Sequence, residues 1–167
     1  MNRNVLLIIA VISIIIMSFA GCGNKANEVT PADAFADRVK TIIAENSELA
    51  GYSMSPLMDQ GSGLYAASAI VDGETIGAVS VRFEGDEITE IIISFAASGV
   101  AQNKYQQPII ASAMALNTGF VYSDVDKLMQ KLDGMLIFGG KPEKINGYTF
   151  SCEWRSSDDQ IFVKFTK

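Results

Sequence analysis

The sequence predicts a single α+β domain in which an antiparallel meander and a C-terminal β-hairpin pack with about three helices. Three observations lead to this fold class. Apolar residues recur at helical spacing after Thr30, the period changes to two from Leu64, and a second alternating segment closes the chain. With 49% apolar residues the chain can form one core, and the sequence contains no internal repeat or second domain boundary.

The first predicted helix begins after Thr30 and ends near Asn46. Thr30 is placed as the N-cap, Pro31 takes the first helical position, and Asp33 returns to the cap. The apolar stripe of this helix consists of Phe35, Val39, Ile42 and Ile43. The next segment, 47–63, contains three glycines and Pro56, which predicts irregular structure or at best an edge strand.

Three strands of a meander are predicted over 64–71, 76–83 and 87–95. The odd number of residues in the loop 84–86 places Val79, Val81 and Phe83 on the same face as Ile91, Ile93 and Phe95. We assign Leu64, Ala66 and Ile70 to this face as well. The reverse face, which carries Tyr65, Ala67, Ala69, Val71, Ile76, Ala78 and Ile92, is less polar than a solvated sheet face. Either a later helix covers this reverse face, or Tyr65, Ile76 and Ile92 mark a partner surface.

Two further helices are predicted between the meander and the hairpin. The first takes Pro108 in its first turn and extends to about Asn117, and the amides from Gln102 to Gln107 would rim the partner surface. The second begins at the cap Ser123 and carries Val125, Leu128, Met129 and Leu132 on one stripe. For the segment from Met135 to Phe138 both helix and strand stay open.

The C-terminal hairpin has the clearest local pattern of residues 22–167. A loop over 156–159 pairs Trp154 with Ile161, Cys152 with Val163 and Phe150 with Phe165. This parity puts Cys152 on the apolar face, where burial would raise the pKa of its thiol and suppress its reactivity. We therefore interpret Cys152 as a packing residue and not as a nucleophile.

Composition argues against most enzyme classes. The chain has no histidine, which removes the usual general base, the commonest zinc ligand and histidine-dependent triads. Its net charge of −6 argues against nucleic-acid binding. No cofactor or metal site is expected. Four carboxylates lie at or near the predicted hairpin tip, those of Glu84, Asp86, Glu87 and Glu90. Their spacing is not that of a calcium-binding loop. A hydrolase that uses these carboxylates as acid and base is the third functional hypothesis.

The N-terminus has the order of a secretory signal peptide. Arg3 precedes an apolar run over 5–17, which is shorter than the ~20 residues of a transmembrane helix. The sequence Phe19-Ala20-Gly21-Cys22 then resembles the lipobox of bacterial lipoproteins, and the following Gly23-Asn24 is similar to Gram-positive members. The resemblance implies cleavage of the signal peptide 1–21 between Gly21 and Cys22, and a diacylglyceryl group on the Cys22 thiol.

These observations predict a lipid-anchored extracytoplasmic domain over 30–167, held at the cell membrane through acylated Cys22. The tether 22–29 reaches at most ~25 Å at ~3.5 Å per residue, so a partner must lie close to the bilayer. Small lipoproteins act as immunity, inhibitor, exclusion or transporter-accessory factors, and by analogy we expect a non-enzymatic domain with a protein or peptide partner. The alternative is a domain that binds a small ligand or lipid in a cavity between helices and sheet.

Overall fold

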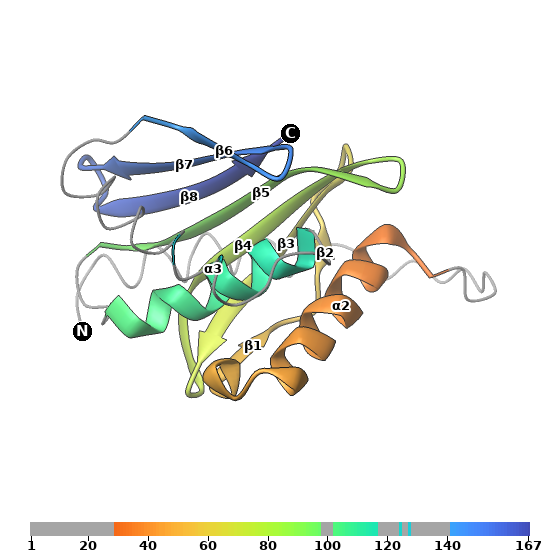
Figure 1. Cartoon of the computed structure of the whole chain (residues 1–167), viewed down its shortest axis with the longest axis horizontal. Helices are drawn as coiled ribbons and strands as arrows, with labels where there is room; N and C mark the ends of the chain where they lie inside the picture. The colour runs from red at the N-terminus through yellow and green to blue at the C-terminus, as the bar shows by residue number, and fades with distance from the viewer. Residues whose placement is uncertain (1–28, 98–101, 117–123, 125–126, 128–140) are drawn as a thin grey trace.

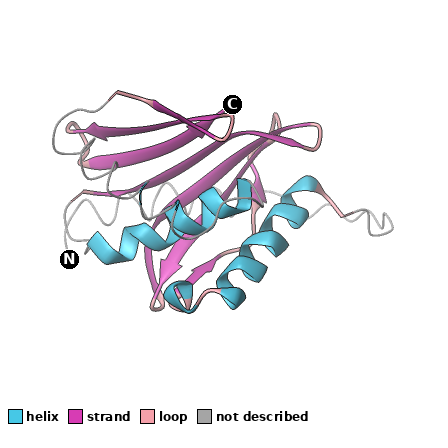
Figure 2. Cartoon of the chain, in the orientation of Figure 1, coloured by secondary structure: helices cyan, strands magenta, loops and turns pink. Residues whose placement is uncertain are grey.

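In the part of the chain that the structure describes, one antiparallel sheet forms one layer and two helices form a second layer (Figure 1). The computed structural model describes residues 29–97, 102–116, 124, 127 and 141–167. Within them, both helices lie on the same side of an eight-stranded sheet, as Figure 2 shows by secondary structure. The α+β class is therefore confirmed.

The count of about three helices is not confirmed. Of the helix predicted from Ser123, only Asp124 and Lys127 are described, and both are helical. The rest of that prediction, and the segment from Met135 to Phe138, lie outside the described residues. No helix within the described ranges is both long and apolar enough to cross a membrane.

Helix α2 spans Pro31–Glu45 and begins and ends as predicted. The Thr30 hydroxyl accepts a hydrogen bond from the Asp33 amide at 3.1 Å, and the Asp33 carboxylate accepts one from the Thr30 amide at 3.2 Å. Asn46 is the C-cap, and a short 3₁₀ helix, η1, follows at Ser47–Leu49. The buried stripe of α2 faces the sheet and consists of Ala32, Phe35, Val39 and Ile42.

The sheet places its strands in the order β1-β3-β4-β5-β8-β7-β6, with β2 also paired to β3. The strands are β1 (Tyr52–Met54), β2 (Met58–Asp59), β3 (Leu64–Val71), β4 (Glu74–Glu84), β5 (Glu87–Ala96), β6 (Glu143–Ile145), β7 (Tyr148–Arg155) and β8 (Gln160–Thr166). All pairs are antiparallel, and the C-terminal hairpin joins the meander through the pairing of β8 with β5. The prediction of five strands was too low because β1, β2 and β6 are too short to show a periodic pattern.

The register of the C-terminal hairpin is confirmed. Trp154 pairs with Ile161, Cys152 with Val163 and Phe150 with Phe165. Phe150, Val163 and Phe165 are buried in the core, whereas Trp154, near the end of β7, is 57% exposed.

The faces of β4 and β5 are also as predicted, although the turn between them is not. Val79 pairs with Ile93 and Val81 with Ile91, and all four have no exposed surface. The turn holds two residues, because Glu84 pairs directly with Glu87. A β-bulge between Phe83 and Arg82 then shifts the register by one residue. With this shift the side chains of β4 and β5 share faces as they would after a loop with an odd number of residues.

The assignment of β3 to the two faces was wrong. Tyr65 pairs with Val81 and Ala67 with Val79, so the odd residues of β3 face the helices and the even residues face away. The cause is a second bulge, where the register shifts between Ala69 and Ile70 and Ile76 is left without a partner. With the two-residue turn at Asp72-Gly73 alone, the even residues of β3 would share a face with Val79 and Val81. The extra residue in β4 exchanges the two faces of β3. It buries Ala67, Ala69 and Val71 and turns away Leu64, Ala66 and Ile70.

Helix α3 spans Gln102–Leu116, so Pro108 lies beyond the first turn in which it was predicted. Because proline has no amide hydrogen, Pro108 cannot donate a hydrogen bond to the preceding turn. The residues before a proline are therefore normally not helical. Contacts with the sheet hold the residues before Pro108. The Tyr105 ring stacks on Phe95 with centroids 4.8 Å apart, and the Lys104 ammonium lies 2.7 Å from the Glu74 carboxylate.

Candidate functional site

An open groove of about 800 Å³ lies between α2 and the sheet edge at β1 and the segment that follows β1. One wall comes from the side of α2 next to its buried stripe, and the other comes from Tyr52 to Leu57. The apolar lining consists of Val29, Ala32, Ala36, Val39, Ile43, Ala44, Tyr52, Met54, Pro56 and Leu57. We refer to this site as the edge groove.

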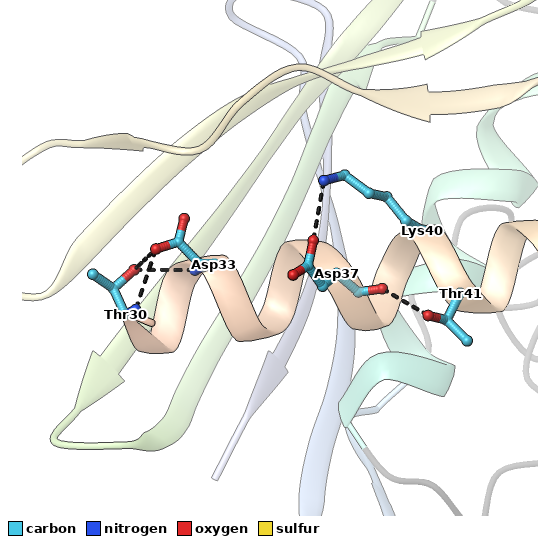
Figure 3. Close-up of polar contacts among 5 residues, drawn as sticks. All are labelled: Thr30, Asp33, Asp37, Lys40 and Thr41. Atoms are coloured by element: carbon cyan, nitrogen blue, oxygen red, sulfur yellow. Dashed lines mark hydrogen bonds and ion pairs between the residues drawn. The ribbon is translucent and has the colours of Figure 1, made fainter. Parts of the chain in front are cut away.

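Three ionisable side chains of α2 line the edge groove, and Figure 3 shows them along the helix. The Lys40 ammonium pairs with the Asp37 carboxylate at 3.1 Å. Hydrogen bonds from the Thr30 hydroxyl and then the Thr30 amide lower the pKa of Asp33. Asp33 is therefore ionised at neutral pH, and the two carboxylates and one ammonium give the groove a net negative charge.

Tyr52 lies between α2 and the sheet and is only 3% exposed. Burial raises the pKa of its phenol, so the group stays protonated. Within the described part of the chain its hydroxyl has no hydrogen-bond partner. A buried hydroxyl without a partner costs ~1–3 kcal/mol, a cost that the packing of the Tyr52 ring must offset.

One exposed apolar side chain lies at the edge groove. Among the residues that the structure describes, three large apolar side chains are exposed, namely Val29 at 71%, Met58 at 46% and Trp154 at 57%. Val29 lines the groove. Met58 pairs with Ala66 and therefore lies on the face of the sheet that points away from the helices.

The partner surface predicted from Tyr65, Ile76 and Ile92 does not lie on one face. Tyr65 shares the helical face with Val81, and its ring meets Phe83 edge-on at 5.7 Å. Ile76 is 8% exposed and belongs to the core, because the bulge turns it toward the helices. Ile92 pairs with Ser80 and Lys164 on the opposite face. The three residues therefore form no common surface.

The amide-rich stretch from Gln102 to Gln107 was expected to rim that surface. It belongs to α3, and among its described side chains, those of Lys104 to Gln107, none lines the edge groove. Its place in the fold is explained by the contacts of Lys104 and Tyr105 with the sheet, described above.

The acidic cluster of the β4–β5 hairpin does not converge on one point. Glu87 forms an ion pair with Lys167, and Glu90 forms one with Arg82 at 3.5 Å. Glu84 and Asp86 are exposed at the turn. Nowhere in the described ranges do three or more potential metal ligands gather. This arrangement gives no support to the carboxylate-dependent hydrolase.

Cys152 is half-buried on the helical face and packs against the core. Burial raises the pKa of its thiol to about 12. The thiol is therefore protonated at neutral pH, which fits the interpretation of Cys152 as a packing residue.

We expect Cys152 to resist alkylation in the folded protein. Because the thiolate is the attacking species, iodoacetamide at about pH 8 should modify the folded chain slower than the denatured chain by about two orders of magnitude. Mass spectrometry of Cys152 peptides over time measures both rates, and similar rates would contradict the burial.

Unfolding returns the thiol pKa to its ordinary 9.0, so the free energy of unfolding should also fall as pH rises from about 9 toward 12.

Sequence reasoning missed the edge groove. Its helical wall was predicted correctly, but the opposite wall comes from the segment expected to be irregular or an edge strand. The residues of the predicted anchor, Gly21 and Cys22, lie outside the described residues. Comparison of the chain with protein-family models, curated proteins and solved structures finds no match.

Proposed function

We propose that the protein is a lipid-anchored binding domain on the outer face of the cytoplasmic membrane, and that it binds a segment of a protein or peptide partner in the edge groove. The observation that carries this proposal is the groove itself. It combines apolar walls from α2 and from the segment Tyr52 to Leu57 with an exposed Val29 at its border.

The sequence supports the lipid anchor, and the fold supports a short distance between the predicted tether and the edge groove. Val29 both ends the predicted tether and lines the edge groove. A tether that spans 22–29 holds the groove within ~25 Å of an acylated Cys22. A membrane-bound partner would therefore meet the groove at a high effective concentration.

Binding without catalysis is the activity that the side chains favour. The chain has no histidine, the Cys152 thiol is protonated, and the acidic residues of the hairpin are divided between ion pairs and solvent. The alternative, a small ligand held between helices and sheet, would have to use the same groove. The centre of that layer is filled, because Val79, Val81, Ile93 and Ile109 have no exposed surface.

The anchor is tested by mass spectrometry of the protein extracted from membranes. We expect the N-terminal peptide to begin at Cys22 and to carry a diacylglyceryl group. The Cys22→Ala chain should lack the lipid and keep residues 1–21. Because its uncleaved apolar segment can itself hold the chain on the membrane, the mass of the N-terminal peptide is decisive and sedimentation is not. An unacylated wild-type chain that begins at another residue would contradict the anchor.

The partner is tested by photocrosslinking in intact cells. We expect p-benzoylphenylalanine in place of Lys40, at the groove rim, to give a discrete adduct with a membrane protein. The same group in place of Lys164, on the opposite face of the sheet, serves as the control. No adduct from either position would contradict the proposed function.

A further inference from the structure

We propose that the edge groove binds an extended, positively charged segment of a partner protein, which pairs with β1 as an added strand. The inference rests on the proposed function, because it specifies the partner that the groove takes. Three features of the groove carry it: the hydrogen-bonding groups of β1, the position of the apolar walls, and the charge of α2.

The register of β1 leaves backbone groups free on its outer edge. The Asp72 amide donates to the Gly51 carbonyl at 2.9 Å, and the Ser55 amide donates to the Ser68 carbonyl at 3.1 Å. In an antiparallel pair the hydrogen-bonded positions alternate, so Ser53 bonds to β3 while Tyr52 and Met54 point away from it. No described residue bonds to the backbone of these two residues. Their amides and carbonyls form a template for another strand.

The side chains of an added strand would meet the apolar walls of the groove at every second position. Tyr52 and Met54 lie on the helical face, since they pair with buried Val71 and Ala69. Residues that bond directly to Tyr52 and Met54 would place their side chains on that face, between β1 and α2. The residue between them would point to solvent on the side of Ser53. The recognised pattern is therefore two apolar residues separated by one polar residue.

The charge of α2 sets the charge of the segment. Asp37 is paired with Lys40, whereas the hydrogen bonds on Asp33 come from the uncharged hydroxyl and amide of Thr30. Among the described residues Asp33 forms no ion pair within 4 Å, and Lys40 acts on it only at longer range, in a chain of net charge −6. A lysine or arginine beside the apolar pair would complement it.

The length of β1 limits how much of the segment pairs. The strand holds three residues, and Pro56, which has no amide hydrogen, follows soon after it. Backbone pairing is thus confined to Tyr52 and Met54, and the walls of the groove must supply most of the affinity. Substitutions in the wall should therefore affect binding strongly.

The test begins with a phage library of random linear peptides, selected on the full-length protein. Ile43→Lys places an ammonium in the groove wall, and Thr41→Lys places the same charge on an exposed part of α2 that does not line the groove. Cationic peptides that bind in the groove should lose about tenfold or more in affinity on Ile43→Lys and keep their affinity on Thr41→Lys. They should be enriched in cations and in alternating apolar residues.

The pairing itself is measured by hydrogen exchange of single amides. Bound peptide should slow the exchange of the Tyr52 and Met54 amides and leave Ser53, already bonded to β3, nearly unchanged. The inference is overturned if no peptide distinguishes Ile43→Lys from Thr41→Lys, or if bound peptide leaves the Tyr52 and Met54 amides unprotected.

The outcome separates this inference from the proposed function. A cellular crosslink from position 164 and none from position 40 would keep the binding domain and remove the edge groove as its site. A crosslink from position 40 with unprotected Tyr52 and Met54 amides would keep the groove and remove the added strand.

Discussion

Replacing Phe95 by alanine is expected to lower the free energy of unfolding by about 3–5 kcal/mol, the cost of truncating a fully buried aromatic side chain. Phe95 is 2% exposed on β5, a strand that pairs with both β4 and β8. Its ring stacks on Tyr105 at an interplanar angle of 4°. The substitution therefore removes core volume and also a contact that holds the turns of α3 before Pro108.

Urea unfolding followed by circular dichroism measures this loss. Phe162→Ala on β8 is the matched control, because Phe162 lies half-buried on the opposite face, with the Arg155 guanidinium 4.6 Å from its ring centroid. We expect the control to cost less than about 2 kcal/mol. Phe95→Leu provides a milder variant should the alanine form not fold. Equal losses for Phe95→Ala and Phe162→Ala would contradict the core described here.

Replacing Gly77 by alanine is expected to cost about 3 kcal/mol or more, which is at the upper end for overpacking. Gly77 follows the bulged residue Ile76 and pairs with Phe95. A β-carbon at Gly77 would overlap with the carbonyl oxygen of Ser94, a backbone atom in the neighbouring strand. Relief would require β4 and β5 to separate locally.

Gly85→Ala is the control for loss of a glycine without overlap. Gly85 has a φ of +60° in the β4–β5 turn, and a β-carbon there would meet nothing within 4 Å. Only the strain of a left-handed residue applies, about 1–2 kcal/mol. Thermal unfolding of both variants gives the comparison, and a Gly77→Ala protein as stable as Gly85→Ala would refute the close approach of β4 and β5.

Local chemistry explains which elements were predictable from the sequence. The capping box of α2 and the register of the C-terminal hairpin each depend on residues close together in the chain, and both are confirmed. The bulge at Ile76 was not predictable, because one additional residue leaves the alternating pattern on either side intact while it reverses the faces. Helix N-terminal to Pro108 was missed because its stabilising contacts come from distant Phe95 and Glu74.

The edge groove was missed for a related reason. Its helical wall is visible in the sequence as the side of α2 next to the apolar stripe. The opposite wall depends on β1, and three residues are too few to show alternation. Tyr52 gives no sequence signal of a buried hydroxyl without a partner, since that property arises only when α2 and β3 close around it.

The position of β8 has a consequence for how the chain reaches its native state. Residues Gln160–Thr166 form an interior strand between β5 and β7. The pairing of β8 with β5 joins segments that are far apart in the sequence, and such contacts form slowly. Until β8 has paired, β5 presents an unpaired backbone edge, so a folding intermediate that lacks β8 is the species in which the meander is most prone to pair with another chain.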